Sequence, residues 1–428
     1  MKPLLGTALI KVANALLGIV VAIVLARALG AADYGVYSTA FVLASVISVF
    51  AQFGLSNLVL RETAVAAAGE NYSGMKSIWI WASRVALSFA FAAIAVGAIA
   101  GFVLRGNYSS AQLATYFLAL AVVPFLALGT LRAAALRGLG HAVLSQFPQL
   151  VLRPFLLLVL ALLLGRMVPA SPQYAMVMQL SATVGAFLAG SWLLWKFAPK
   201  ELLKATAGTF PRRQWWTASG IMALSAGMNQ INNYADILLL GLFRSSEEVG
   251  QYRAAFQVSA LVAFGVQVVA MVYAAKFAQF RHNTDPAQFQ KIVSRAARLA
   301  FGFAFPAALV LVLWGGFFLE LLFGAEFRDG YAPLAILAAG QAMAAFFGSI
   351  GILLNMSGME KHVAKGMGFV ALSNLVLNIV LIPPFGMTGA ALATVLSISV
   401  WKVHLWHSAR KELHVDSRAL VFGGRRDG

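Results

Sequence analysis

The stretch LARALGAADYGVYSTAF at residues 25–41 returns later in the chain as LGLFRSSEEVGQYRAAF at residues 240–256. The two copies stand at a constant offset of 215 residues, and similar residues match along them. The matched pairs are Asp33 with Glu248, Gly35 with Gly250, Tyr37 with Tyr252, Ala40 with Ala255, and Phe41 with Phe256. We interpret the copies as equivalent turns of an internal repeat; the alternative is chance similarity in a sequence of biased composition.

Long apolar segments flank both copies. Hydrophobic residues make up 61% of the 428 residues and charged residues only 11%, and the mean hydropathy is +0.81. One membrane span needs about 20 apolar residues, and only helices or closed barrels satisfy the backbone inside a bilayer. The composition therefore predicts an all-α integral membrane protein with about twelve transmembrane helices. The predicted spans are 4–27, 36–60, 77–104, 112–136, 143–165, 173–196, 215–243, 249–277, 292–323, 331–356, 362–382 and 387–408.

The spans form two groups of six, because the longest cytoplasmic connection separates the sixth span from the seventh. An even number of spans separates the two copies of the repeat, so both halves have the same orientation in the membrane. Parallel repeats are typical of transporters, in which the substrate path lies between the halves. The predicted parts are an N-terminal lobe at 1–198, a cytoplasmic linker at 199–214, a C-terminal lobe at 215–408 and a cytoplasmic tail at 409–428.

Basic residues indicate the orientation. With both termini on one side of the membrane, 26 of the 32 Lys and Arg residues fall on that side. Cytoplasmic loops are the ones enriched in Lys and Arg, so we predict that both termini are cytoplasmic. The basic residues on the opposite side are Arg27, Arg105, Arg166, Arg244, Arg253 and Arg328.

Several function classes are disfavoured by composition. The absence of cysteine excludes disulfides, thiolate metal sites and thiol nucleophiles. Six scattered histidines without an HExxH pattern argue against a catalytic metal, and we expect no metal site and no cofactor. The net charge of +17 does not indicate nucleic-acid binding, because the basic residues recur between apolar runs rather than clustering on a polar face.

The repeated turns and the last two spans resemble the lipid-linked oligosaccharide flippases. These are the polysaccharide-biosynthesis exporters of the multidrug/oligosaccharidyl-lipid/polysaccharide exporter superfamily. The similarity follows the same order and spacing over nearly the whole chain. The matching residues are Arg27-Ala-Leu-Gly30, Asp33-Tyr-Gly-Val-Tyr37, Gly54-Leu55, Asp236 with the Leu-Leu-Leu-Gly241 that follows, Glu248-Val-Gly-Gln-Tyr252, and Asn378-Ile-Val-Leu-Ile-Pro-Pro-Phe-Gly386-Met-Thr-Gly389.

This resemblance implies two six-helix lobes around a central cavity and transport by alternating access. It implies that undecaprenyl-pyrophosphate-linked oligosaccharide moves from the inner to the outer leaflet of the bacterial inner membrane. The related lipid II flippases usually carry two more helices than the twelve predicted here, which favours a capsule, O-antigen or exopolysaccharide glycan. The implied partners are the lipid-linked glycan, membrane lipids, a polysaccharide polymerase and glycosyltransferases.

A diphosphate crossing hydrocarbon needs basic groups in a wet cavity, because an uncompensated charge there costs several kcal/mol. Arginine suits phosphate through paired, charge-assisted hydrogen bonds. Arg153 lies deepest in a predicted span. The predicted substrate-binding residues are Arg153, Arg84, Lys11, Arg253 and Arg27.

Alternatives stay open for most of these basic residues. Arg84 and Lys11 lie where snorkelling to the headgroups is equally consistent. Arg27 and Arg253 flank the repeated turns, where pairing with Asp33 or Glu248 is the competing interpretation. Four more basic residues lie near the cytoplasmic face and are interpreted as topology determinants as readily as cavity residues: Arg132, Arg137, Arg295 and Arg298.

Polar groups at one depth in spans seven, eleven and twelve predict a cation-coupling site. They are Asp236, Asn374, Asn378 and Thr394. Hard oxygen ligands of this kind bind Na⁺, and an intramembrane carboxylate also suits H⁺ coupling. The related flippases place similar groups on the same spans, although an acidic residue stands there at the position of Asn378. The alternatives are hydrogen bonding between helices and pairing of Asp236 with an arginine.

Two other functions compete with a glycan flippase. A drug/cation antiporter of the same superfamily would favour an acidic or aromatic cavity, whereas the candidate residues here are mostly basic. A membrane glycosyltransferase, polymerase or ligase acting on the same lipid carrier would need a sizeable outer loop, and every predicted outer loop is short. We therefore expect a transporter and not an enzyme.

Overall fold

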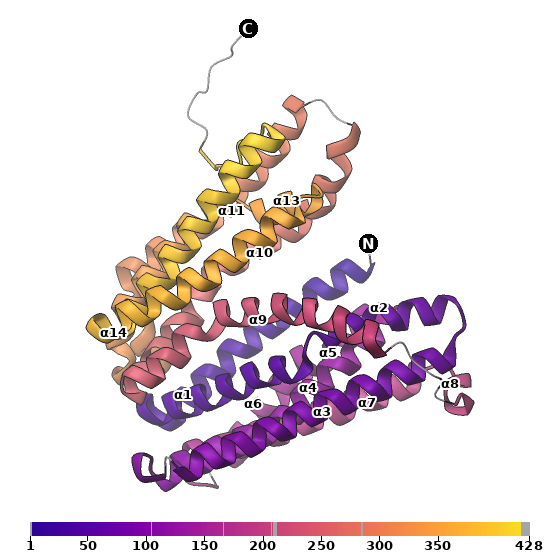
Figure 1. Cartoon of the computed structure of the whole chain (residues 1–428). Helices are drawn as coiled ribbons and strands as arrows, with labels where there is room; N and C mark the ends of the chain where they lie inside the picture. Colours follow the sequence, from indigo (N-terminus) through magenta and orange to yellow (C-terminus); the bar gives the residue numbers. More distant parts are fainter. Residues whose placement is uncertain are drawn as a thin grey trace. The chain divides into compact units, whose positions relative to one another are not determined.

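A computed structural model describes residues 2–103, 105–165, 167–206, 208, 212–283 and 286–420. Every regular element within these ranges is a helix, which confirms the predicted all-α class (Figure 1). Arg166, residues 207 and 209–211 of the predicted linker, and residues 421–428 of the predicted tail lie outside the described residues.

The chain forms two compact units, Met1–Gln230 and Ile231–Gly428. The division lies inside one helix, α9 (Arg212–Phe243), and not in the predicted linker at 199–214. The reason is a tryptophan cluster at the start of α9. Trp215 is buried in a core of the first unit, and its ring lies 5.2 Å from the ring of Trp81.

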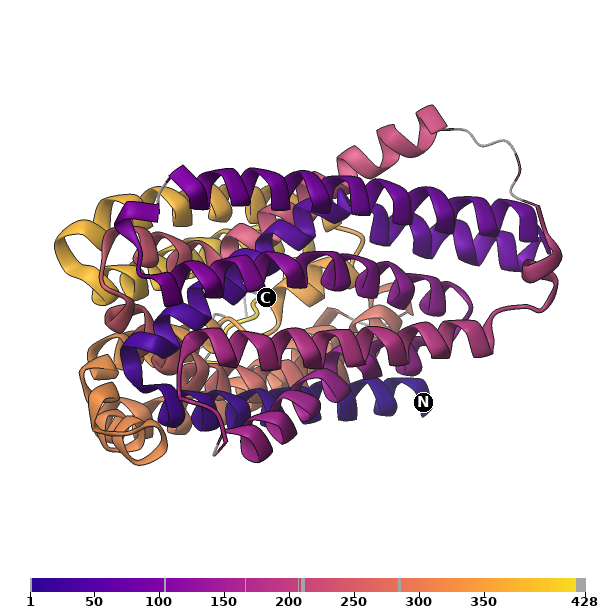
Figure 2. The same cartoon turned by 90° about the horizontal axis from the view of Figure 1, so that it is seen from below.

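In the first unit α4 packs along α1, α3 and α7, and Figure 2 shows several of the long helices running side by side. The elements are α1 (Lys2–Gln52), α2 (Leu55–Ala68), α3 (Tyr72–Val103), η1 (Arg105–Asn107), α4 (Ser110–Gly138), α5 (Ala142–Phe147), η2 (Pro148–Leu152), α6 (Arg153–Leu164), α7 (Pro172–Phe197), α8 (Glu201–Lys204) and the first part of α9.

In the second unit α12 packs against α10, α11 and α14. The elements are the last part of α9, α10 (Ser246–Asn283), α11 (Pro286–Phe323), η3 (Ala325–Gly330), α12 (Tyr331–Phe346), α13 (Ile350–Met356) and α14 (Glu360–Leu413).

Nine helical segments of the described residues are long and apolar enough to cross a membrane. Two of them, Gly6–Gln52 and Gly366–Leu413, are long enough for two crossings each. Each is interrupted at a glycine of positive φ, Gly30 with φ 76° and Gly386 with φ 54°. Residues with a Cβ adopt this backbone region with difficulty, so these glycines make the turns between predicted spans one and two and between spans eleven and twelve.

The remaining predicted span, 215–243, is the long helix α9, which is not among the nine apolar segments. Its centre carries the polar run Asn-Gln-Ile-Asn-Asn-Tyr-Ala-Asp at residues 229–236. Polar groups inside a span are costly and are usually functional. With α9, the helices account for the predicted twelve spans.

The breaks between helices repeat at the offset of 215 residues. Each of three breaks in the first unit has a counterpart 215 residues later in the second unit. The corresponding breaks are Gly30 and Ser245, Ser109 and Gly324, and Ser171 and Gly386. The structural repeat therefore extends over the turns of both units, which supports the repeat interpretation against chance similarity.

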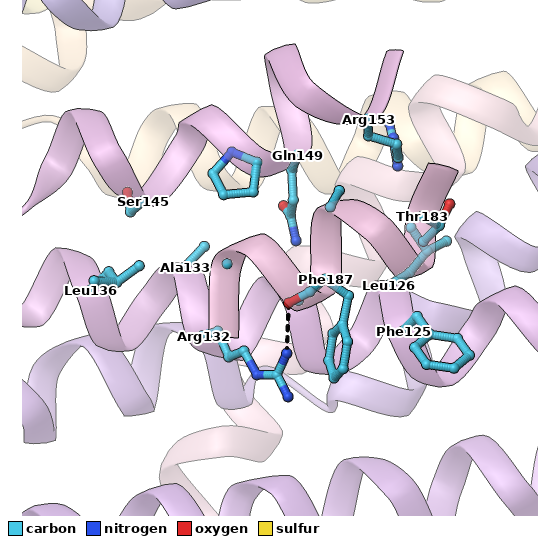
Figure 3. A pocket seen from close by; sticks show the side chains of 14 residues that line it. Phe125, Leu126, Arg132, Ala133, Leu136, Ser145, Gln149, Arg153, Thr183 and Phe187 are labelled. Atoms are coloured by element: carbon cyan, nitrogen blue, oxygen red, sulfur yellow. Dashed lines mark hydrogen bonds between the residues drawn. The ribbon is translucent and has the colours of Figure 1, made fainter. Parts of the chain in front are cut away.

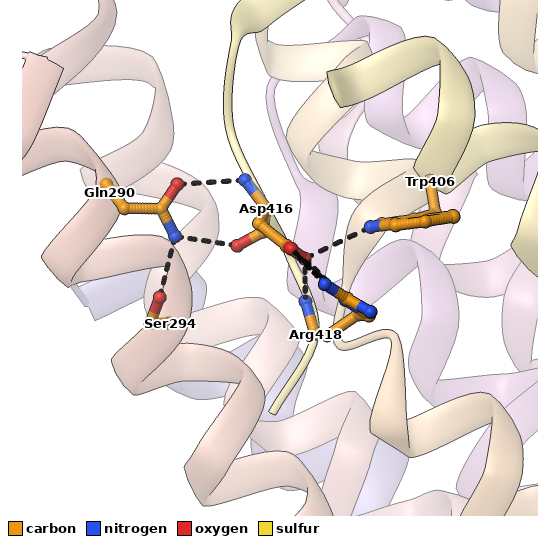
Figure 4. A network of polar contacts seen from close by, with 5 residues as sticks. All are labelled: Gln290, Ser294, Trp406, Asp416 and Arg418. Atoms are coloured by element: carbon orange, nitrogen blue, oxygen red, sulfur yellow. Dashed lines mark hydrogen bonds and ion pairs between the residues drawn. The ribbon is translucent and has the colours of Figure 1, made fainter. Parts of the chain in front are cut away.

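After α14 ends at Leu413, residues 414–420 pack across the second unit. Val415 is buried in an apolar cluster with residues of α10, α11 and α13. The Gln290 side chain donates to the Asp416 carbonyl oxygen at 2.7 Å and accepts from the Asp416 N–H at 2.8 Å. The Asp416 carboxylate accepts from Trp406 and Arg418 (Figure 4). This segment fastens the end of α14 to α11.

Asp416 gives this segment a pH dependence. Burial tends to raise the pKa of Asp416, but hydrogen bonds from Arg418 and Trp406 and the Arg418 charge outweigh burial and lower that pKa below its usual value. The contribution of Asp416 to stability is therefore present above about pH 4 and is lost as the pH falls through the lowered pKa.

We expect Asp416→Asn to reduce the free energy of unfolding by about 1–2 kcal/mol at neutral pH, because charge-assisted hydrogen bonds are lost. Thermal unfolding of the detergent-solubilised protein measures this. The difference from wild type should shrink below about pH 4. Glu412→Gln, at an exposed carboxylate just before this segment, is the control. A difference that stays constant from neutral to strongly acidic pH would contradict the assignment.

Candidate functional site

Arg153 stands at a local widening of the helix that forms the fifth predicted span. Pro154 has no N–H and cannot bond to the carbonyl four residues earlier. The helix opens instead into a π-helical turn, η2, and the Arg153 N–H donates to the Pro148 carbonyl five residues back. Single π turns inside helices frequently occur at functional sites. Arg153 is half-buried, with its guanidinium 5.6 Å from the centre of the Phe41 ring.

Arg153 lines a cavity within the first unit, between α4, η2 and α7. Figure 3 shows Gln149 between Arg132 and Arg153. Gly129 admits Gln149, because a Cβ at residue 129 would lie 2.8 Å from the Gln149 amide nitrogen. The lining residues are Phe125, Leu126, Gly129, Arg132, Ala133, Leu136, Ser145, Pro148, Gln149, Arg153, Thr183, Ala186, Phe187 and Gly190.

Arg132 extends from α4 towards α7. It donates to the Phe187 carbonyl oxygen at 3.0 Å and to the Ser191 hydroxyl, and its guanidinium lies 3.4 Å from the centre of the Phe187 ring. These partners are all neutral. Arg132 lines the cavity. The sequence alone left open whether Arg132 is a cavity residue or a topology determinant.

The other predicted substrate residues lie elsewhere. Lys11, Arg27 and Arg84 are exposed, and none of them lines this cavity. Glu248 pairs with Arg244 at 3.0 Å, which corrects the alternative that Glu248 pairs with Arg253. Arg253 is half-buried, with its guanidinium 6.0 Å from the centre of the Phe256 ring.

The second unit contains a buried polar chain around Asp236. The Tyr252 hydroxyl donates to Asp236 Oδ2 at 2.6 Å, and the Ile237 N–H donates to Oδ1 at 2.8 Å. The Thr394 side chain lies near the Tyr252 hydroxyl. Two of the four predicted coupling residues, Asp236 and Thr394, thus both lie near Tyr252. Arg253 lies close enough to act electrostatically on Asp236.

The other two predicted coupling residues pair with each other on α14. Asn378 donates through its side-chain nitrogen to the Asn374 carbonyl oxygen at 2.8 Å and to Asn374 Oδ1 at 3.1 Å. Both residues are buried. Within the described part of the chain, Asn378 Oδ1 and Asn232 Oδ1 are buried with no hydrogen-bond donor. Because a buried oxygen without a partner is costly, these atoms suit a cation or a water molecule.

The same connection exists in the first unit without a carboxylate. Tyr37 donates to Gln179 Oε1 at 2.9 Å, and the Gln179 amide donates to Thr183, a residue that lines the cavity. Tyr37 corresponds to Tyr252, and Gln179 corresponds to Thr394, both at the offset of 215. An equivalent tyrosine therefore lies near the sixth span in each unit, and in the second unit this tyrosine, Tyr252, also donates to the Asp236 carboxylate.

Tyr252 was predicted only as a marker of the repeat, and Asn232 had no predicted role. Signals for both were present, since Tyr252 recurs in the two copies of the repeat and Asn232 stands one helical turn before Asp236.

Comparison with known proteins identifies the family and the fold of the chain. A family model described as polysaccharide biosynthesis protein matches residues 24–331. The probable low-salt glycan biosynthesis flippase Agl15 of Haloferax volcanii is 27% identical over 168 residues, which are 39% of this chain. The probable flippase AglR of the same organism is 27% identical over 174 residues, 40% of this chain. The match spans only 36% of the length of either relative.

Solved structures share the fold. The lipid II flippase MurJ in an inward closed conformation matches with a TM-score of 0.74 and 14% identity, covering 94% of this chain and 87% of that one. An inward-facing multidrug resistance transporter of the MATE family and MOP superfamily matches with a TM-score of 0.70 and 13% identity, covering 95% of this chain and 98% of that one. At such low identity these matches establish the two-lobe fold alone.

Proposed function

Because the chain belongs to the polysaccharide biosynthesis protein family, we propose that it is a flippase for undecaprenyl-pyrophosphate-linked oligosaccharide. It moves this lipid from the inner to the outer leaflet of the bacterial cytoplasmic membrane by alternating access. The two curated relatives named above are described as probable flippases, one of them in glycan biosynthesis. The partners are the lipid-linked glycan, membrane lipids, a polysaccharide polymerase and glycosyltransferases.

The observation that carries this proposal is the charge of the first-unit cavity. Two arginines line it, and none of its lining residues is acidic. A cationic wall favours an anionic cargo such as a diphosphate over the organic cations of a drug antiporter. The other proposed substrate contacts are Arg84, Lys11, Arg253 and Arg27. These residues bind the substrate in conformations that expose them to the transport path.

Cation coupling belongs to the second unit in this proposal. The oxygen ligands for the cation come from α9 and α14. They belong to Asp236, Asn374, Asn378 and Thr394. The buried, donor-free Asn378 Oδ1 supports a cation or proton-linked role. Na⁺ and H⁺ are the two coupling ions that this chemistry admits.

Reconstitution tests the function directly. The full-length protein is placed in proteoliposomes with a fluorescent undecaprenyl-pyrophosphate-linked oligosaccharide, and a membrane-impermeant quencher measures how much of it changes leaflet. We expect leaflet exchange well above that of protein-free vesicles. Transport of an organic cation with no movement of the glycan lipid would instead indicate a drug/cation antiporter and would contradict the proposal.

The orientation is part of the same proposal, with both termini cytoplasmic. Reporter fusions at residue 205 and at the carboxy terminus should be active in the cytoplasm, and fusions at residues 107 and 246 should be active outside. The basic residues support this arrangement, because 26 of 32 lie on the side of the termini. A carboxy-terminal reporter that is active only outside the cytoplasm would reverse the topology.

A further inference from the structure

Residues 414–420, which follow α14, form an extended strap within the second unit. Val415, Ser417 and Ala419 are buried, and the two residues between them are half-buried. This alternation is typical of an extended chain that turns one face towards a core. Figure 4 shows Asp416 between α11 and α14, to which its hydrogen bonds connect it. The strap therefore runs inside the helix bundle rather than over its surface.

The strap reaches the break in the tenth predicted span. There α12 ends at Phe346 and α13 begins at Ile350, with Gly348 at φ 64° between them. A helix end leaves carbonyl groups without donors of their own helix, and such groups are costly where water is excluded. The Ala419 N–H of the strap donates to the Phe346 carbonyl oxygen at 2.8 Å. The Lys402 ammonium of α14 donates to the Gly348 carbonyl oxygen at 3.3 Å. The strap thus caps a broken helix.

Gly348 lets the strap and α11 meet at this break. A Cβ at residue 348 would lie 2.9 Å from the Cβ of Ala297 on α11 and 3.3 Å from the carbonyl oxygen of Ser417. The break, α11 and the strap are therefore packed together with no room for a side chain at residue 348. While the strap is in place, it closes this end of the second unit.

The first unit has no equivalent strap among its described residues. At the offset of 215, residues 346–349 correspond to 131–134, which lie inside the unbroken helix α4. Residues 414–420 correspond to 199–205, which contain α8 and are held at α3, because Lys76 donates to the Ala205 carbonyl oxygen at 2.7 Å. The strap and the helix break that it caps are therefore particular to the second unit and do not come from the repeat.

The closed strap leaves polar groups incompletely satisfied. Within the described residues, the hydroxyl oxygens of Ser349 and Ser417 are buried without a hydrogen-bond partner. A lysine ammonium has three N–H donors, and the Lys402 ammonium has one neutral acceptor there, at a distance longer than that of an ordinary hydrogen bond. Buried polar groups without partners are costly. Water would satisfy all of these groups, so their hydration favours an open strap.

The contacts that hold the strap closed are few. Among its three buried side chains only that of Val415 is larger than a serine, and apolar stabilisation scales with the area buried. The Gln290 side chain adds two hydrogen bonds to the Asp416 backbone. Segments with few buried apolar contacts open locally at a lower free energy than the whole unit needs to unfold. The strap has the properties of such a segment.

We propose that the strap is a reversible gate, which opens while the second unit stays folded and admits water to Lys402, Ser349 and the break between α12 and α13. In the orientation proposed above, this end of the unit faces the cytoplasm, so the water enters from that side. The gate does not rest on the flippase function, because all of its contacts lie within the second unit.

Thiol labelling of the full-length protein in detergent tests the gate. The chain contains no cysteine, so an introduced cysteine is the only thiol that a maleimide modifies. Val415→Cys reports on the strap, and Val293→Cys on α11 is the matched control, because both valines are 3% exposed in one apolar cluster. Leu420→Cys, at a residue 47% exposed, gives the rate of unrestricted access. We expect Val415→Cys to react about tenfold or more faster than Val293→Cys, and more slowly than Leu420→Cys.

Two further substitutions, each combined with Val415→Cys, test the opposing contributions. Gln290→Ala removes the two hydrogen bonds that hold the strap and should accelerate labelling about tenfold. Lys402→Met removes the ammonium whose hydration favours opening, and it should slow labelling about threefold or more. If the strap were only a fixed cap, losing the hydrogen bond from Lys402 to Gly348 would accelerate labelling instead.

Each result decides the proposal. Equal rates for Val415→Cys and Val293→Cys mean that the strap leaves only when the unit unfolds, and they overturn the gate. A rate for Val415→Cys equal to that of Leu420→Cys means that the strap is never closed, which overturns it as well. Unchanged or faster labelling with Lys402→Met contradicts the stated cause of opening. If Val415→Cys does not fold, Ser417→Cys takes its place. No substrate is present, so a negative flippase assay leaves the result unaffected.

Discussion

Replacing Asp236 by Asn is expected to lower gradient-driven transport of the lipid-linked glycan by about tenfold or more, the scale of a typical coupling free energy. The substitution keeps an oxygen that accepts from Tyr252 but removes the charge that a cation or proton neutralises. The measurement is leaflet exchange in proteoliposomes under an imposed Na⁺ gradient and, separately, an imposed proton gradient. Whichever gradient drives the wild type should have little effect on the variant.

Tyr252→Phe separates charge from positioning. It leaves the Asp236 carboxylate in place and removes the hydroxyl that donates to it. We expect it to retain a response to the gradient at a reduced transport rate. Tyr37→Phe, the equivalent change in the first unit, removes a hydrogen bond to a neutral Gln179 and should leave the gradient response intact. A full gradient response in Asp236→Asn would exclude Asp236 from coupling.

Arg153→Ala is expected to reduce glycan export by about 10- to 100-fold, the range for losing hydrogen bonds to a charged group. It removes the deeper of the two cavity arginines, which stands at the π turn of η2 and faces Phe41. Complementation of a flippase-null strain measures export, and the amount of protein in the membrane fraction verifies insertion. Arg153→Lys should restore export only in part, because an ammonium keeps the charge without the planar fork.

Arg298→Gln provides the comparison for a basic residue at an exposed position of α11 in the second unit. Since it lies outside the first-unit cavity, we expect it to affect export far less than Arg153→Ala does. Normal glycan export by Arg153→Ala at wild-type protein levels would remove Arg153 from the substrate site. A variant that fails to insert is replaced by Arg153→Gln, which retains bulk and hydrogen-bonding capacity.

The residues that could be placed well from the sequence are those whose roles depend on short stretches of chain. Gly30 and Gly386 lie between predicted spans, and the structure interrupts a long helix at each of them. The offset of 215 matched Tyr37 with Tyr252, and each tyrosine lies near the residue that the same offset matches on the sixth span, Gln179 or Thr394. The four residues predicted as a coupling site in the second unit are buried in the structure.

Other features depend on neighbours far away in the sequence. Arg132 and Arg153 each lie in an apolar segment. Nothing in their local sequence shows that they line the same cavity. That arrangement follows from the rotation of α4 about its own axis, which is set by packing against α7, and from the π turn that Pro154 imposes. Likewise, Trp215 assigns the start of α9 to the first unit because it packs on Trp81.

The sequence by itself determined the all-α class, the twelve spans and the internal repeat. Bilayer thickness and backbone hydrogen bonding constrain each span separately, so local composition is enough to reveal them. Only the tertiary structure decided that Tyr252 contacts Asp236, that Arg132 turns inward, and that the chain divides within α9. The face that a helix presents to its neighbours results from side-chain packing between distant segments, and hydropathy along the chain does not encode it.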